Sequence, residues 1–472
     1  MERVVQKYVL PEQINAAWAG KLFISFLLPA LILLLHPIGL DERQSAVVAG
    51  VLLAVIWWSS GIIKKIPASI FLILVFLFFS GAGTEKVFAF PLSETFPMIV
   101  ITYLFSQAIA NAGLIERIFQ PLLLKFVHTP IQCIFAIVVF FFLTMYVIPQ
   151  PLARLIIGAT VFSQFLKNTN LSEKTKSVLA YAVFLMYAIV NMSAKDADLI
   201  LNHVAADFSS VPITNGMWVK AMLLPTLVCC ALLILSLVFL FRKDLLGIKL
   251  SLSKAEIKEE KEEKEEASGF SHRQKAALVI IAATVLLWMT SNIHGINNTL
   301  ITIVGTVLLF AVGVLHRQDF RTIDVPTLIF LTAAFAIGGV MQACGAADKV
   351  FGLLQGIFPA SFSPLYLCVM IVIAMALHMI LGSNTTTVSI VIPGMILLCG
   401  NVVSQEVIVY TVILSVSFHA FLPFHSVAIM IGASNNYFPA SYVTKMGIFQ
   451  TIIVFFTACA VFLPYWRLIG LL

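Results

Sequence analysis

The chain has 472 residues, of which 60% are hydrophobic and only 11% are charged. Soluble domains carry roughly 25% charged residues, so this composition excludes an ordinary soluble enzyme. The formal net charge is +6, but the basic residues flank apolar segments rather than cluster on a soluble face, which argues against nucleic acid as a partner. We therefore expect an all-α polytopic membrane protein in a lipid bilayer.

The sequence offers little for cofactor or metal chemistry. Its seven cysteines lie in or beside apolar runs and show no spacing typical of metal ligands or of a disulfide framework. A phosphate-binding loop of the GxxxxGK type is missing from the sequence, so an ATP-driven pump is not supported. We expect neither a metal nor another cofactor.

Apolar runs recur along the whole chain, and a membrane-crossing helix needs about 20 such residues. The N-terminal sequence lacks a signal-peptide cleavage pattern, so we expect the first helix to be retained. The runs predict about 11 transmembrane helices and two re-entrant hairpins. They lie near residues 18–37, 44–63, 67–82, 96–112, 131–148, 152–166, 176–204, 216–241, 275–292, 298–315, 325–342, 365–381, 386–400, 405–431 and 446–470.

Two pairs of runs are too short or too interrupted for ordinary spans. Residues 131–148 and 152–166 meet at IPQPLAR, and residues 365–381 and 386–400 meet at LGSNTTT. Since each pair meets at a polar or proline-containing tip, we expect two hairpins that enter and leave the membrane on the same side.

Loop charge predicts the orientation. The short basic loops all fall on one side of the membrane if the N-terminus is cytoplasmic, which places the C-terminus outside. We expect a multi-pass protein of the cell (plasma) membrane. The one long polar stretch, residues 242–274, would then be a charged cytoplasmic linker without chemistry of its own.

An internal repeat is the strongest organisational signal. Residues 111–119 (NAGLIERIF) match residues 343–351 (ACGAADKVF) at an offset of 232 positions. The same offset superimposes the two hairpin tips and aligns residues 423–426 (PFHS) with 191–194 (NMSA), where two other apolar runs are interrupted. The copies would lie on opposite sides of an odd number of crossings, so we expect two inverted repeats, which are typical of secondary transporters.

The second hairpin tip is the best candidate for a ligand site. Polar groups at membrane depth need partners, and the segment that follows Ser383 and Asn384 begins a helix near Thr385. A helix N-terminus offers free N–H groups to a carboxylate or phosphate. An ordinary helix cap at a tight turn is the alternative.

At this point the chain resembles a known family. Ser383-Asn384-Thr385, followed by residues 388–393, is similar to the substrate motif of the divalent anion:sodium symporter family, and so are Leu422-Pro423 and the paired hairpins. The resemblance implies a homodimer in which each protomer has a scaffold domain and a moving transport domain. It also implies elevator-type transport of dicarboxylates, tricarboxylates or sulfate.

The resemblance also implies a division of the chain into seven parts. We expect first-repeat scaffold helices in 1–95, a first-repeat transport part with an interface helix and the inward hairpin in 96–210, a connecting transmembrane helix in 211–241, the linker in 242–274, second-repeat scaffold helices in 275–324, a second-repeat transport part with the outward hairpin in 325–445, and the last transmembrane helix in 446–472.

The departures from the family pattern point to cations. In sodium-coupled relatives the hairpin tips and unwound segments supply oxygens to Na⁺, whereas here these places carry Arg154, Lys195 and His425. Charge at membrane depth is costly unless it serves a pathway or a partner. We expect these three side chains to replace the sodium ions, with Pro151, Arg154, His425 and Ser426 joining the SNT motif in substrate binding. Pairing of Lys195 with Asp196 or Asp198 is the alternative.

Other polar or small residues receive weaker interpretations. We expect His378 and His419 to be packing residues, and Asn435-Asn436 to line the cavity or make a turn. Gly338, Gly339 and Gly345 would allow helices to approach closely.

The sequence therefore predicts a transporter rather than an enzyme. The preferred function is sodium-independent exchange of small dicarboxylates such as 2-oxoglutarate, malate, succinate or fumarate. A Na⁺- or H⁺-coupled symporter of citrate, dicarboxylate or sulfate is the first alternative. An intramembrane enzyme that uses Ser383 or Ser426 with His425 is the second.

Overall fold

The computed structural model describes residues 16–251, 270–422 and 425–472, and the regular elements within these ranges are helical. The expected all-α architecture is confirmed. Pro423, most of the expected linker and the first 15 residues lie outside the described ranges.

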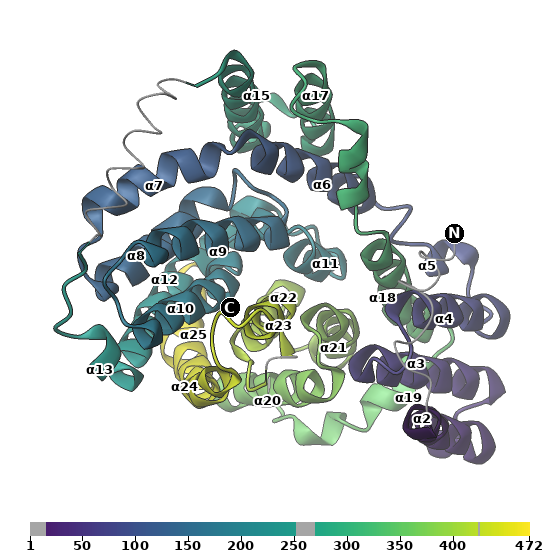
Figure 1. Cartoon of the computed structure of the whole chain (residues 1–472). Helices are drawn as coiled ribbons and strands as arrows, with labels where there is room; N and C mark the ends of the chain where they lie inside the picture. Colours follow the sequence, from purple (N-terminus) through teal and green to yellow (C-terminus); the bar gives the residue numbers. More distant parts are fainter. Residues whose placement is uncertain (1–15, 252–269, 423–424) are drawn as a thin grey trace.

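The first half of the chain contains one run of helices in simple order (Figure 1). They are α2 (Ala16–Leu35), η1 (Pro37–Gly39), α3 (Glu42–Ser60), α4 (Lys65–Phe79), α5 (Thr84–Val87), α6 (Thr95–Ala112), α7 (Leu114–Phe126), α8 (Pro130–Thr144), α9 (Pro151–Lys167), α10 (Glu173–Asn191), η2 (Lys195–Ala197), α11 (Leu201–Asp207), α12 (Asn215–Leu240) and α13 (Arg242–Leu245).

The second half repeats much of this order. Its helices are α15 (His272–Met289), α16 (Ser291–His294), α17 (Asn298–Ala311), η3 (Arg317–Thr322), α18 (Val325–Ala343), α19 (Ala346–Gly352), η4 (Gln355–Ile357), α20 (Pro364–Leu381), α21 (Asn384–Cys399), α22 (Gln405–Phe418), α23 (Val427–Ser434), α24 (Ala440–Thr457), a π-helical turn (Ala458–Phe462) and α25 (Leu463–Leu468).

Six stretches of the described chain are long and apolar enough to cross a membrane. They are Trp18–Leu35, Thr95–Ala112, Asn215–Leu240, Val325–Ala343, Pro364–Leu381 and Ala440–Leu468. Large apolar side chains such as Leu34 and Phe78 are 77% and 75% exposed, as expected of a surface that faces lipid. The protein is a polytopic membrane protein, and the expected total of about 11 crossings remains a prediction.

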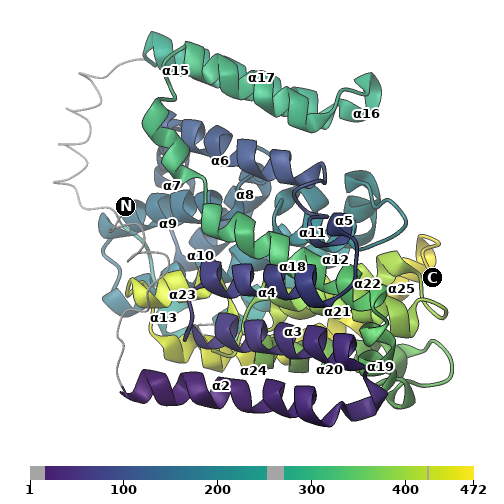
Figure 2. The ribbon, with the colours of Figure 1, turned by 90° about the vertical axis from the view of Figure 1, so that its right-hand side faces the viewer.

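The offset of 232 residues is visible in the helix boundaries. It relates α3 to α15, α4 to α17, α6 to α18, α9 to α21 and α10 to α22, and the paired helices begin within two residues of the expected positions. In Figure 2, α6 leads to α7 near the left end of the molecule, whereas its counterpart α18 leads to α19 at the right end. The two copies therefore run in opposite directions, which is the inverted repeat that the sequence predicts.

Both hairpins and both interrupted helices are present. Helices α8 and α9 pack together, as do α20 and α21. Helix α10 ends at Asn191 and α11 begins at Leu201, while α22 ends at Phe418 and α23 begins at Val427. We call residues 192–200 the first break and residues 419–426 the second break. The hairpins meet the two breaks in the interior, where polar backbone groups would otherwise lack partners.

Figure 1 shows how the remaining helices surround this interior. Helices α6 and α7 form an arc that separates α15 and α17 from the hairpins, and α18 lies beside α4. The arrangement is compatible with an outer frame and an inner moving part, but the seven-part division of the chain remains a prediction.

The three glycines serve different purposes. A Cβ on Gly338 would come within 2.8 Å of Pro393 Cγ on α21, so Gly338 does permit a close helix approach. A Cβ on Gly339 would meet nothing nearer than Lys86 Cδ at 3.9 Å. Gly345 has a φ of +72°, and the turn between α18 and α19 requires that conformation.

This contrast gives a stability prediction. Gly338→Ala should lower the free energy of unfolding by about 1–3 kcal/mol, because the added methyl group overpacks the contact with α21. Gly339→Ala is the matched control and should be neutral or stabilising by up to about 1 kcal/mol, since alanine favours a helix interior. Thermal unfolding of the detergent-solubilised protein measures both, and equal behaviour of the two variants would contradict the packing argument.

Candidate functional site

A cavity of about 210 Å³ lies where both hairpin tips meet both breaks. Its lining comes from α4, α6 and α18 on one wall and from the hairpins and interrupted helices on the other. The residues are Lys65, Tyr103, Pro151, Leu152, Tyr187, Ala188, Asn191, Met192, Asp198, Ile200, Leu201, Asn202, Asp324, Thr327, Phe330, Leu331, Ser383, Asn384, Thr385, Ser417, Ser426, Val427 and Ala428. Of the predicted substrate residues, Pro151, Ser383, Asn384, Thr385 and Ser426 are brought together here.

The second hairpin tip presents a helix N-terminus to this cavity. Ser383 is the N-cap of α21, and Asn384 and Thr385 form the first turn. The Asn384 Oδ1 atom is buried without a hydrogen-bond partner within the described structure. A buried polar atom without a partner is costly. Together with the free N–H groups of the first turn, the Asn384 amide is suited to meet a ligand.

The first hairpin and the second break also begin helices at the cavity. Pro151 is the first residue of α9, and the Gln150 Oε1 atom accepts a hydrogen bond from the Ala153 N–H. Ser426 is the N-cap of α23 and its side chain makes no cap hydrogen bond. The positive ends of α9, α21 and α23 therefore converge on one space, which favours an anionic ligand.

Arg154 does not reach this cavity, which corrects the expectation that it grips a bound carboxylate. Its side chain is completely buried. Nη1 donates to the carbonyl oxygens of Met145 at 3.0 Å and Ile148 at 2.9 Å, and Nη2 donates to Asn191 Oδ1 at 2.6 Å and to the Ala197 carbonyl. Both terminal nitrogens are committed to the protein, so no pair of donors is left for a ligand.

The contacts of Arg154 join two elements. Met145 and Ile148 belong to the tip of the first hairpin, whereas Ala197 belongs to the first break. Asp198 follows Ala197 directly, and its Oδ1 atom accepts hydrogen bonds from the N–H groups of Ile200 at 3.0 Å and Leu201 at 2.8 Å. A guanidinium and a carboxylate thus lie on neighbouring residues of the break, and the buried positive charge has a nearby negative charge.

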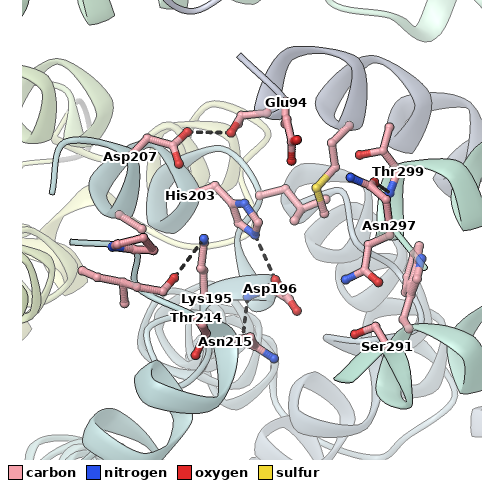
Figure 3. A pocket seen from close by; sticks show the side chains of 18 of the residues that line it. Glu94, Lys195, Asp196, His203, Asp207, Thr214, Asn215, Ser291, Asn297 and Thr299 are labelled. Atoms are coloured by element: carbon pink, nitrogen blue, oxygen red, sulfur yellow. Dashed lines mark hydrogen bonds and ion pairs between the residues drawn. The ribbon is translucent and has the colours of Figure 1, made fainter. Parts of the chain in front are cut away.

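Lys195 also differs from its expected place. It lines a second, larger cavity of about 980 Å³ beside the first break, together with Asp196, His203 and Asp207 (Figure 3). Its Nζ atom donates to the Ile213 carbonyl at 3.0 Å rather than to Asp196 or Asp198. The Asp196 carboxylate instead contacts His203 Nε2 at 2.9 Å. Lys195 therefore does not act as a cation of the substrate cavity in this structure.

His425 does not line the 210 Å³ cavity either, because its side chain is completely buried behind Ser426. It belongs to a cluster with His378 and His419, the two histidines that were expected to serve only in packing. The His378 Nδ1 and His419 Nδ1 atoms are 3.0 Å apart, and the His419 and His425 rings are stacked with their centroids 5.4 Å apart. Sequence alone gave no reason to join residues from three segments.

Asn435 and Asn436 make a turn. The Asn435 side chain donates to the Ile431 carbonyl at 2.9 Å, and Asn436 has a left-handed φ of 59°. Neither residue lines the 210 Å³ cavity.

Sequence reasoning missed the charged residues that do line the cavity. Lys65 is the one basic side chain among the described lining residues, and its Nζ atom lies 5.3 Å from the centre of the Phe330 ring. Asp324 caps α18, because its carboxylate accepts hydrogen bonds from the Thr327 N–H at 3.2 Å and hydroxyl at 2.6 Å. The sequence signal for Lys65 was its membership of a basic loop, which indicates orientation and not a site.

The whole chain can now be compared with known proteins. The model of a family described as "Sodium:sulfate symporter transmembrane region" matches residues 15–472. The chain belongs to this family. A comparison with curated proteins finds no match. Membership of a transporter family explains the inverted hairpins and the converging helix ends, and it identifies the protein as a transporter rather than an enzyme.

Proposed function

We propose that the protein exchanges small dicarboxylates across the membrane without sodium, and that Arg154 replaces a sodium ion at the first break. 2-Oxoglutarate, malate, succinate and fumarate are the proposed substrates. The observation that carries this proposal is the set of oxygen atoms around the Arg154 guanidinium.

Three carbonyl oxygens and one amide oxygen surround that guanidinium, and they come from a hairpin tip and an unwound segment. Such uncharged oxygens are the ligands that a hard cation prefers. In sodium-coupled members of the family these same elements hold Na⁺. A covalently attached cation cannot dissociate with the substrate, so it would hold the tip in place without a sodium gradient.

The cavity supports a small dianion as the cargo. Its volume of about 210 Å³ is below the roughly 300–1,000 Å³ typical of sites for drug-sized ligands. Three helix N-termini, the Asn384 amide and the Lys65 ammonium can meet two carboxylates at opposite ends of a short chain. Serine and threonine hydroxyl groups at the hairpin tip would complete the hydrogen bonds.

Two further features belong to this proposal. We expect a homodimer that works by an elevator mechanism, with the hairpins, the interrupted helices and the cavity moving against α4, α6 and α18. We also expect the N-terminus in the cytoplasm of a cell whose plasma membrane holds the protein, and the C-terminus outside.

Exchange can be tested with purified protein in liposomes. Uptake of labelled 2-oxoglutarate, malate, succinate or fumarate should be fast into vesicles loaded with dicarboxylate and near background into empty vesicles. Internal sulfate and internal citrate serve as comparison loads. Equal uptake into loaded and empty vesicles would contradict exchange.

Lys65 offers a separate prediction about affinity. Lys65→Gln should raise the KM for a dicarboxylate about tenfold, which corresponds to about 1.4 kcal/mol, because the cavity loses its mobile positive charge. Lys65→Arg should keep most of the affinity, and Lys167→Gln, at the exposed end of α9, is the control for loss of one charge. An unchanged KM in Lys65→Gln would remove Lys65 from the site.

A further inference from the structure

The three histidines at the second break form one buried cluster. His378 lies near the end of α20, His419 follows α22 directly, and His425 lies at the end of the break. His378 and His425 are completely buried and His419 is 3% exposed. Within the described structure no group of three or more His, Cys, Asp or Glu is arranged to hold a metal ion, so the cluster requires another explanation.

The hydrogen bonds of His378 define where its protons lie. Its Nε2 atom is 3.1 Å from the His425 carbonyl oxygen, which can only accept, so Nε2 carries a proton. Its Nδ1 atom is 3.0 Å from His419 Nδ1. A hydrogen bond between two ring nitrogens contains one proton. When His378 is neutral, that proton belongs to His419.

The same reasoning applies to His425. Its Nδ1 atom accepts a hydrogen bond from the Phe421 N–H at 3.3 Å, so Nδ1 carries no proton. Neutral His425 therefore has its proton on Nε2. The cluster is fully described by three neutral rings with defined tautomers.

The pair can take up one extra proton without losing a hydrogen bond. If His378 holds protons on both nitrogens, its Nδ1–H donates to His419 Nδ1, and the proton of His419 resides on Nε2. The contact between the rings then reverses its direction but remains. The His378 bond to the His425 carbonyl is the same in both states and becomes charge-assisted.

We propose that the His378–His419 pair is a proton-binding site whose occupancy sets the charge beside the anion cavity. The ligand of this site is a single proton, and the site rests on the proposed function in that the cargo is an anion. Asn384, which lines the cavity, faces His378 from α21. A protonated pair would thus attract a dianion through the hairpin tip, and a neutral pair would not.

The surroundings leave the pair as the group that responds to pH. The titratable groups that act on His378 are His419 and His425, and the one that acts on His419 is His425. None of the described carboxylates, lysines or arginines acts on the pair from α20, α21, α22 or α24. Lys65, Asp198 and Asp324 lie on the lining of the neighbouring cavity.

The test uses fumarate exchange between about pH 6 and pH 9, a range in which both carboxyl groups of the substrate are ionised. In the wild-type protein the KM for fumarate should rise at least about tenfold across this range as the pair loses its proton. His378→Gln should show a KM that is independent of pH and equal to the wild-type value at high pH. His128→Gln, at an exposed position, should retain the wild-type profile. A wild-type KM that does not change with pH, or a profile that His378→Gln leaves unchanged, would overturn the proposal.

A second measurement keeps the proposal testable if the variant does not fold or the exchange assay fails. Solid-state NMR of the full chain in bilayers, with ¹⁵N-labelled histidine, reports the tautomers of the nine histidines. The proposal requires a protonated His378 Nε2 and one titration step shared by His378 and His419. Independent titration of the three rings would contradict it. Sodium-dependent uptake into empty vesicles would overturn the proposed exchange while this titration still decided the proton site.

Discussion

Arg154→Ala is expected to reduce dicarboxylate exchange about a hundredfold or more, because the first hairpin tip loses the cation that fixes it to the first break. The substitution leaves the carbonyl oxygens of Met145, Ile148 and Ala197 and the Asn191 amide oxygen without their donor. It also leaves Asp198 without its nearby positive charge. Removal of one partner from a buried charge pair costs about 3–5 kcal/mol, so a lower unfolding temperature should accompany the loss of transport.

Controls can separate transport from folding. Arg154→Lys keeps the charge but not the planar fork of donors, so it should fold and recover only part of the exchange rate. Arg117→Ala, on α7 and away from the cavity, serves as the control for removal of an arginine. Exchange at the wild-type rate by a folded Arg154→Ala protein would show that Arg154 is not needed at the tip.

Asn384→Asp should have the second largest effect. The change keeps the shape of the side chain but places a negative charge at the N-terminal turn of α21, where the anion would bind. Repulsion between the carboxylate and the dianion should raise the KM by about a hundredfold, since like charges placed together cost several kcal/mol. The fold should be kept, because a carboxylate in the first turn of a helix is favourable.

The matched control is Asn401→Asp, which makes the same chemical change in an exposed turn outside the cavity. Concentration dependence of uptake measures both variants, and thermal unfolding reports their stability. A wild-type KM in Asn384→Asp would show that the anion does not bind at the second hairpin tip.

The features that the sequence predicts well are those that repeat. The offset of 232 residues relates helices throughout both halves, because each helix pair occupies an equivalent place in its half. The hairpin tips could be located from the short apolar legs and the polar residues between them. The convergence of Ser383, Asn384, Thr385 and Ser426 then followed from the rule that interrupted segments meet at the substrate.

The roles of the charged residues could not be predicted in this way. Position along the chain places Arg154 three residues after Pro151, yet the direction of its side chain depends on how α9 packs against the first break. Lys195 adjoins the same break but turns to another cavity. Helical and unwound segments allow either direction, and packing between distant segments selects one.

The histidine cluster and Lys65 show the same limit for contacts across the fold. His378 and His419 are 41 residues apart and meet through packing of α20 against α22. Lys65 lies far along the chain from the hairpins whose cavity it lines. No local pattern marks such contacts, since they exist only when the helices are assembled.

The sodium dependence of exchange tests the central claim most directly. Initial rates of labelled dicarboxylate uptake into dicarboxylate-loaded proteoliposomes would be measured in sodium buffer and in choline buffer. Replacement of sodium by the Arg154 guanidinium predicts equal rates in the two buffers and no accumulation when a sodium gradient is applied to empty vesicles. Accumulation driven by that gradient would contradict the account, because a bound sodium ion would then be coupled to the anion.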